Sequence, residues 1–142
     1  LYELVTSALN ERGVAVRDAR ILVLGTAFKP NVADFRNSPA RRFIELLRDH
    51  GACVSYHDPH VPRFPVAGHL FAPEVEGDAL ASVELTASEL EASDAVVIVI
   101  GHDGIDYTWV VRHARLVVDA VNATRDCTHE RAKIRRIGAP TG

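Results

Sequence analysis

Residues 21–39 read ILVLGTAFKPNVADFRNSP. The first four are apolar, which is typical of a strand buried on both faces. A glycine follows at position 25, and Ser38-Pro39 offers an N-cap serine with a proline at the first helical position. The stretch therefore predicts a strand, a polar loop and a helix, the first crossing of a parallel α/β sheet. The loop does not read GxGxxG, because a lysine and an arginine stand where a dinucleotide fold has later glycines.

The rest of the chain continues this alternation. Residues 59–82 hold many of the prolines and glycines and predict an irregular excursion. Further strands are expected at 52–57, 95–100 and 116–118, with a short one near Ile137, and further helices at 1–13, 86–92 and 106–113. Strands that alternate with helices build parallel sheets through right-handed crossovers. We expect an α/β fold, a Rossmann-like three-layer sandwich with a mostly parallel sheet.

The composition bounds the class of protein. The chain has 142 residues, which suits one domain, and its net charge of −3 gives no reason to expect a nucleic acid or a membrane as partner. Its two cysteines lack CxxC spacing, which suits a reducing compartment, and we expect the cytoplasm. The chain starts at Leu1 and contains no methionine. We therefore expect it to be a piece of a longer protein.

Polar residues gather where the predicted strands end. They are Gly25 with its loop, His57-Asp58-Pro59-His60, Gly101-His102-Asp103 and Asp119-Ala120-Val121-Asn122. Ligands of parallel α/β sheets bind at the carboxyl ends of the strands. This edge of the sheet is the predicted site.

The loop after the first strand has the residues of an anion site. Gly25 permits a tight turn, Phe28 offers a flat ring, and Lys29 is a point charge of the kind that binds phosphate. Arg36 suits a bidentate phosphate or carboxylate. A nucleoside diphosphate fits this set. The spacing alone leaves open a second interpretation, a solvated loop with a salt bridge between Asp34 and Arg36.

Four stretches, in order, resemble motifs of one enzyme family, the UDP-sugar 6-dehydrogenases, which act on UDP-glucose, UDP-N-acetylglucosamine or UDP-N-acetylmannosamine. The stretches are GTAFKPNVADFRNSP, GACVSYHDPHVP, SDAVVIVIGHDGID and LVVDAVNATR. The first resembles G-x-A-[FY]-K-x-x-[VT]-x-D-x-R-x-S-P, which opens the family's C-terminal, UDP-sugar-binding domain. The resemblance implies that residues 16–142 are this domain and residues 1–15 the end of the central connecting helix. The wording SYHDPHVP is more like the N-acetylhexosamine branch.

The resemblance also implies what the chain lacks. Full-length members oxidise the sugar C6 alcohol to a carboxylate with two NAD molecules and a nucleophilic cysteine in a G-F-G-G-x-C motif. This chain has neither that motif nor a GxGxxG. Cys53 is expected in the core and Cys127 in a polar tail, so no catalytic residue is assigned and the isolated domain should be inactive. NAD would be bound mainly by a missing N-terminal domain, and the full-length protein would be a homo-oligomer.

Residue by residue, the resemblance implies that Phe28 and Lys29 contact the UDP-sugar. Arg36 would reach across to the NAD, Asp34 would orient that arginine, and Gly25 would support the turn.

One position departs from the family pattern. The family commonly has an arginine in its D-x-R-N motif, and Val121 stands there in this chain. Asn122 or Arg125 is then left to make the substrate contact, and we assign Asn122 to the substrate site.

Other interpretations are weaker. A metal site could be imagined from His57, Asp58, His60 and His69, but adjacent strand residues point to opposite faces, and no metal is expected. His102 and Asp103 could suggest acid–base chemistry, but a helix-capping loop at Asp106 explains them. The alternative function is a non-catalytic Rossmann-like nucleotide-binding or interaction module.

Overall fold

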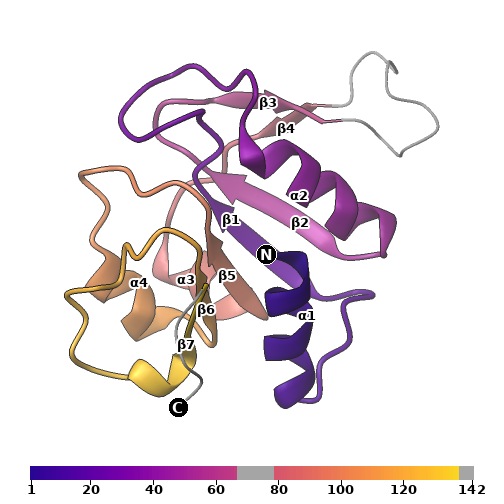
Figure 1. Ribbon diagram of the computed structural model, residues 1–142, viewed down its shortest axis with the longest axis vertical. Coiled ribbons are helices and arrows are strands. Elements are labelled where there is room, and N and C mark those ends of the chain that lie inside the picture. The colour runs from indigo at the N-terminus through magenta and orange to yellow at the C-terminus, as the bar shows by residue number, and fades with distance from the viewer. Residues whose placement is uncertain (67–78, 138–142) are drawn as a thin grey trace.

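A parallel five-stranded sheet forms the centre of the computed structural model, which describes residues 1–66 and 79–137 (Figure 1). The strand order is β2-β1-β5-β6-β7, and every neighbouring pair in it is parallel. The strands are β1 (Arg20–Leu24), β2 (Cys53–His57), β5 (Ala95–Ile98), β6 (Val117–Asp119) and β7 (Ile134–Arg136). A separate antiparallel pair consists of β3 (Arg63–Pro65) and β4 (Ala79–Ala81).

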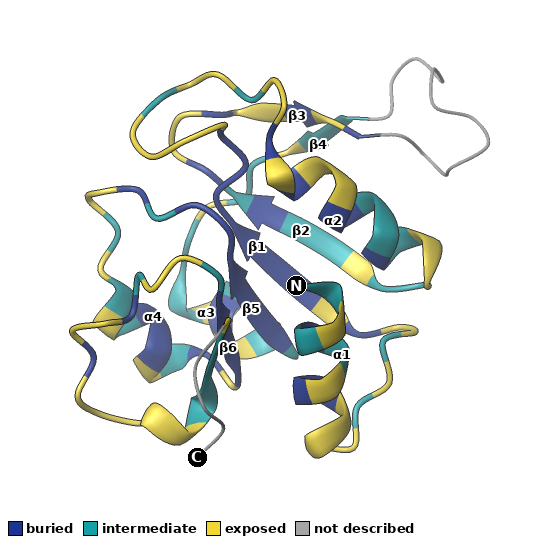
Figure 2. Ribbon diagram, viewed as in Figure 1, coloured by how far each residue is buried: buried dark blue, intermediate teal, exposed yellow. Residues whose placement is uncertain are grey.

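Helices cover both faces of this sheet. Side chains alternate along β1, so that Ile21 and Val23 pack in one apolar cluster and Leu22 and Leu24 in the other. The first cluster includes residues of α1 (Tyr2–Glu11) and α2 (Pro39–Asp49), and the second those of α3 (Ala87–Ala92) and α4 (Tyr107–His113). The central strands are accordingly buried along nearly their whole length (Figure 2). The predicted three-layer α/β sandwich is confirmed.

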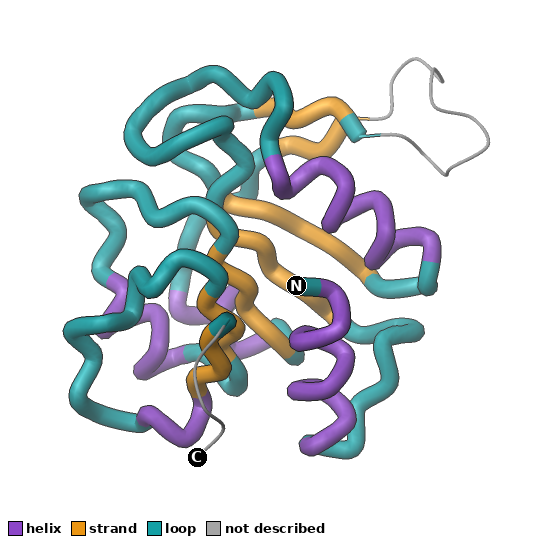
Figure 3. The backbone as a smooth tube through the Cα atoms, in the orientation of Figure 1, coloured by secondary structure: helices purple, strands orange, loops and turns teal. Residues whose placement is uncertain are grey.

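The chain leaves β1 and β5 in opposite directions. From β1 it passes through α2 to β2 on one side, and from β5 it passes through α4 to β6 on the other side. The loops that follow β1 and β5 therefore diverge above the same edge of the sheet (Figure 3). Such a topological switch point is where open α/β sheets bind their ligands.

Three helices begin at the predicted caps. The side chain of Ser38 accepts a hydrogen bond from the Ala40 N–H, Thr86 accepts from Glu89, and Asp106 accepts from Trp109, each at 3.1–3.2 Å. These bonds satisfy amide groups that the first turn of a helix leaves unpaired. No helix within residues 1–66 and 79–137 is long and apolar enough to span a membrane.

The two cysteines lie where they were not expected. Cys53 is exposed because it opens β2, an edge strand of the sheet. Cys127 is buried against α4 in the second apolar cluster. Both predictions are therefore wrong.

Short elements account for the other differences. The excursion predicted at 59–82 contains β3 and β4, while residues 67–78 lie outside the described part of the chain. The strand expected near Ile137 is β7, and a 3₁₀ turn, η1 (Arg131–Lys133), comes directly before it in the chain. The division of the chain at residues 15 and 16 stays a prediction, and α1 packs into the core through Val5, Ala8 and Leu9.

Candidate functional site at the ends of β1 and β5

The loop after β1 presents an aromatic ring and a cation to solvent. The N–H of Phe28 donates to the carbonyl of Asp34, which closes the loop on itself. The Phe28 ring is 49% exposed, and Lys29 beside it is also exposed. The loop therefore presents an apolar ring, half in solvent, next to an ammonium group. It matches a ligand that carries both a flat base and a negative charge.

Gly25 makes the turn that leads into this loop. Its φ of +93° lies in the region that favours glycine, and its N–H donates to the carbonyl of His57 at 3.0 Å. The glycine thus extends the pairing of β1 with β2 in a backbone conformation that other residues rarely adopt, where the chain enters the loop.

Asp34 and Arg36 form the salt bridge that the sequence allowed. One carboxylate oxygen of Asp34 accepts from the backbone N–H (2.9 Å) and Nε (3.1 Å) of Arg36, and the other accepts from Nη2 at 3.0 Å. The side-chain hydrogen bond from Arg36 lowers the pKa of Asp34 to about 2. The Arg36 side chain is 82% exposed. Two nitrogens of the guanidinium therefore contact Asp34, while most of the side chain stays in solvent.

A buried carboxylate, Asp58, joins three loops beneath this surface. Its Oδ2 accepts from the N–H groups of Thr26 (2.8 Å) and Ala27 (3.0 Å), and its Oδ1 accepts from the N–H of His60 at 2.8 Å. The same Oδ2 lies 2.8 Å from Nε2 of His102, and both side chains are fully buried. Burial raises the pKa of Asp58, but the hydrogen bonds outweigh it and the pKa lies below its ordinary value.

Asn31 connects the same histidine to the loop after β1. Its N–H donates to Nδ1 of His102 at 2.8 Å. Its side chain exchanges two further bonds with Asp103, at 3.0 Å and 2.8 Å. Sequence analysis placed Asp58 at a strand end and His102 in a capping loop and missed this network. The sequence shows only that polar residues follow two strands. It does not show that Asp58 and His102 contact each other, because that contact depends on the strand order.

The loop after β6 is built on a second buried carboxylate, Asp119. It accepts from the N–H groups of Val121, Ala123 and Thr124 at 2.8–3.0 Å. Asn122 stands at the exposed tip of this loop with a φ of +58°.

Val121 and Arg125 lie in the same loop after β6 as Asn122. Val121 is 42% exposed, and a Cβ on Gly101 would lie 3.5 Å from its side chain. Nη1 of Arg125 donates to the Asn122 carbonyl at 3.2 Å. The loops after β5 and β6 are thus in contact, and the assignment of Asn122 to the substrate site stays a prediction.

The residues considered for a metal site are otherwise engaged. Nδ1 of His57 lies 2.7 Å from the carbonyl of Val83, while Asp58 contacts His102. His69 is outside the described residues. Across residues 1–66 and 79–137, no group of three or more His, Cys, Asp or Glu side chains gathers in a way that could hold a metal ion.

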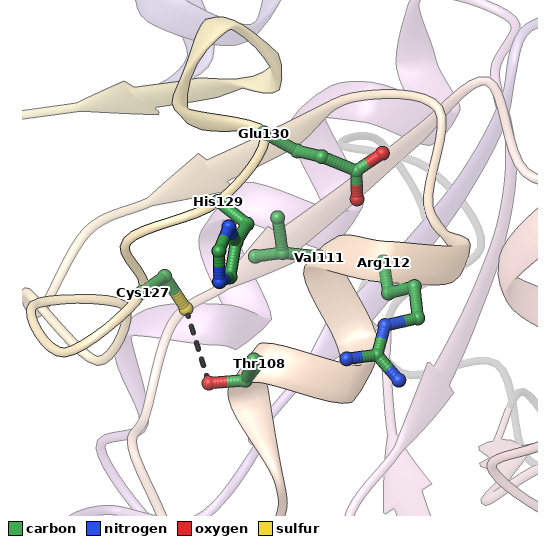
Figure 4. Close-up of a pocket in the computed structure, with 6 residues that line it drawn as sticks. All are labelled: Thr108, Val111, Arg112, Cys127, His129 and Glu130. Atoms are coloured by element: carbon green, nitrogen blue, oxygen red, sulfur yellow. Dashed lines mark hydrogen bonds between the residues drawn. The ribbon is translucent and has the colours of Figure 1, made fainter.

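A pocket of about 240 Å³ lies elsewhere, beside α4 (Figure 4). Its lining residues are Thr108, Val111, Arg112, Cys127, His129 and Glu130. The thiol of Cys127 lies 3.6 Å from the hydroxyl of Thr108. This pocket contains none of the predicted site residues.

Comparison with known proteins identifies the family. Residues 22–126 match the model of the UDP-glucose/GDP-mannose dehydrogenase family, UDP binding domain. A UDP-N-acetyl-D-mannosamine dehydrogenase of Methanococcus maripaludis is 40% identical over 60 residues, which are 42% of this chain and 14% of that protein. A UDP-glucose 6-dehydrogenase of Rhizobium meliloti is 47% identical over 47 residues, 33% of this chain and 11% of that protein.

Solved structures show the same fold. The UDP-N-acetyl-D-mannosamine dehydrogenase of Pyrococcus horikoshii superposes with a TM-score of 0.70 at 24% identity, covering 96% of this chain and 29% of that one. The UDP-glucose dehydrogenase of Pyrobaculum islandicum gives 0.59 at 30% identity, with 89% and 28% covered. This chain thus spans less than a third of the length of each of these relatives.

Proposed function

Because the chain belongs to the UDP-glucose/GDP-mannose dehydrogenase family, as its UDP-binding domain, we propose that the loop after β1 binds the UDP part of a UDP-sugar. In this arrangement the Phe28 ring lies on the uracil and the Lys29 ammonium neutralises the diphosphate. Asn122 contacts the substrate from the neighbouring loop. Gly25 supports the turn.

One observation carries this assignment. Phe28 and Lys29 stand exposed and adjacent on a loop that leaves the sheet at its topological switch point. The loop is fixed from below by Asn31 and closed on itself by the Phe28–Asp34 bond. A fixed loop presents its ring and its charge to a ligand without first losing conformational freedom, which favours binding.

For the whole protein we propose an NAD-dependent oxidation of the sugar C6 alcohol to a carboxylate, a step of polysaccharide biosynthesis. This chain would supply the substrate half of the cleft and no catalytic residue. Arg36, oriented by Asp34, would reach an NAD bound mainly by another region of the protein. Residues 1–15 would continue a central helix that joins the regions, and the assembly would be a homo-oligomer. Both cysteines are free thiols, which supports a cytoplasmic location.

A calorimetric titration of this chain tests the proposal. The ligands are UDP-glucose, UDP-N-acetylglucosamine, UDP and NAD, since relatives named for glucose and for an N-acetylated sugar both match the chain. Lys29→Ala should weaken UDP-sugar binding about tenfold, because a hydrogen-bonded charge contact with the diphosphate is lost.

The matched control is Lys133→Ala. The Lys133 ammonium donates to the carbonyls of Val111 and Arg112 at the end of α4. This variant should bind like the wild type, and NAD should give no saturable response. Equal losses in the two variants, or no saturable binding of any UDP compound, would contradict the proposal.

A further inference from the structure

His102 has no contact with solvent, yet both of its ring nitrogens are engaged. Nε2 lies 2.8 Å from Oδ2 of Asp58, and the side chains of both residues are fully buried. Nδ1 lies 2.8 Å from the backbone nitrogen of Asn31. The ring thus stands between the end of β2 and the loop that carries Phe28 and Lys29.

These two contacts fix the protonation state of the ring. A backbone N–H can only donate, so Nδ1 of His102 must accept the bond from Asn31 with its lone pair. The single proton of the neutral imidazole is then on Nε2 and is donated to the Asp58 carboxylate. A second proton, on Nδ1, would point at the N–H of Asn31 and remove that bond.

Several other groups face His102. The Asp58 carboxylate accepts the proton on Nε2, and the ring of His60 lies edge-on at 4.8 Å between centroids. Tyr107 donates from its hydroxyl to the His102 carbonyl at 3.3 Å, and burial raises the pKa of this phenol to about 12, so it stays neutral. Asp103 is engaged with the side chain of Asn31.

The bond to Asn31 is a point of attachment for the ligand loop. Asn31 lies two residues after Lys29, and its φ of +63° lies in the left-handed region, which asparagine adopts more readily than other non-glycine residues. Loss of the bond to His102 would leave the Asn31 N–H without its partner. The Phe28–Lys29 stretch would then lose one of the contacts that fix it.

We infer that His102 is a positioning residue for UDP-sugar binding, which in its neutral form holds Asn31 and thereby the Phe28–Lys29 stretch, and which releases this loop when its second ring nitrogen is protonated. The inference rests on the proposed function of that loop. It assigns the histidine no contact with the substrate.

The test is a pH series of calorimetric titrations of this chain with UDP-glucose, between about pH 5 and pH 8, the range in which histidines titrate. UDP-glucose is the probe because a diphosphate esterified at both ends keeps its charge throughout this range. Wild-type affinity should fall about tenfold when the second ring nitrogen is protonated, because the loop then loses its attachment.

Three variants assign this pH profile to a residue. His102→Gln offers an amide N–H to Asp58 and a carbonyl to Asn31 and cannot be protonated, so it should bind at high pH like the wild type and show a flat profile. His102→Leu removes both bonds and should bind weakly at every pH. His60→Gln removes the neighbouring ring but leaves both hydrogen bonds of His102, so its affinity should still fall at low pH.

Several outcomes would overturn the inference while leaving the proposed function in place. They are a UDP-glucose affinity in the wild type that does not change with pH, and a profile that survives in His102→Gln or disappears in His60→Gln. Absence of binding at every pH would instead contradict the proposed function.

Measurements on the protein without ligand test this inference separately from the proposed function. Nitrogen-15 spectra of the imidazole should show the proton on Nε2 at high pH. The protection factor of the Asn31 amide, which is its measured exchange rate corrected for the intrinsic rate at each pH, should fall as the pH falls. A proton on Nδ1 at high pH would overturn the inference even if His102→Leu failed to fold.

Discussion

Gly25 lies against Ile100 so closely that a Cβ on the glycine would stand 2.6 Å from the Ile100 carbonyl oxygen and 2.7 Å from its Cβ. The two residues follow β1 and β5, the neighbouring strands from which the chain departs in opposite directions. The segments that follow β1 and β5 are therefore in contact at position 25, where only glycine fits.

Gly25→Ala should destabilise the fold through this contact. The loss combines a strained φ of +93° with a backbone clash, and we expect about 3 kcal/mol or more of the free energy of unfolding. Gly104→Ala is the matched control, because its φ is +89° but nothing lies within 4 Å of the added Cβ. It should cost about 1 kcal/mol. Urea unfolding of both variants measures the difference, and equal losses would show that the contact with Ile100 does not matter.

Phe28→Ala should weaken UDP-sugar binding without unfolding the protein. Stacking of a base on an aromatic side chain contributes about 1–3 kcal/mol, so the dissociation constant should rise by about fivefold or more. The ring is already half exposed, and the free energy of unfolding should change by less than about 0.5 kcal/mol. Calorimetry and urea unfolding provide the two readouts.

Ile137→Ala is the control for the removal of an exposed apolar side chain. Ile137 is 53% exposed and follows β7, at the far edge of the sheet from β2. If this variant lost as much affinity for UDP-sugar as Phe28→Ala, the assignment of the ring to the uracil would be wrong.

Asp58→Asn should remove part of the acid dependence of folding. Because the pKa of Asp58 is lower in the folded state, its ionised form contributes stability that is complete above the ordinary value of 3.8 and is lost as the pH falls through the folded value. The asparagine variant should lose about 2–4 kcal/mol near neutral pH, since three amides and His102 lose a charged partner. It should also unfold with a smaller dependence on pH below about pH 4.

Urea unfolding at a series of pH values measures both effects, with Asp126→Asn as the control at an exposed position. A loss at neutral pH no larger than that of the control would contradict the role of Asp58 as the group that joins three loops.

Arg36→Ala should act on Asp34 and leave UDP-sugar binding by this chain intact. Without the guanidinium, the pKa of Asp34 should rise from about 2 toward its ordinary value of 3.8. Carboxyl carbon shifts followed by NMR during an acid titration report this pKa, and Arg41→Ala, which removes an ion pair with Glu45, should leave it unchanged. A fall in UDP-sugar affinity as large as that of Lys29→Ala would place Arg36 in the substrate site instead.

The fold could be predicted because local signals agreed with one another. The apolar runs at 21–24 and 95–98 form the neighbouring strands β1 and β5. Each of the predicted cap residues Ser38, Thr86 and Asp106 begins the helix that the sequence pattern placed directly after it. β3 and β4 were missed because each is only three residues long and lies in a segment rich in proline. The exposure of Cys53 follows from the edge position of β2, which a single strand's sequence does not reveal.

The candidate site was predictable only in part for the same reason. Phe28, Lys29, Asp34 and Arg36 lie on one loop, so their grouping follows from the sequence. Asp58 and His102 are 44 residues apart and lie after β2 and β5, with β1 between them. Their side chains can meet because the residues between them at the end of β1 have small side chains. These residues are Gly25, Thr26 and Ala27. That proximity depends on strand order, which the alternation of strands and helices leaves undetermined.

The most direct test of the account is a map of backbone amide shifts in this chain during titration with a UDP-sugar. The account predicts saturable shifts confined to the ends of the strands, at residues 25–31, 58–60, 101–103 and 119–123. Shifts that centre on Thr108, Cys127 and Glu130, around the pocket beside α4, would contradict it, and so would a spectrum that does not respond at all.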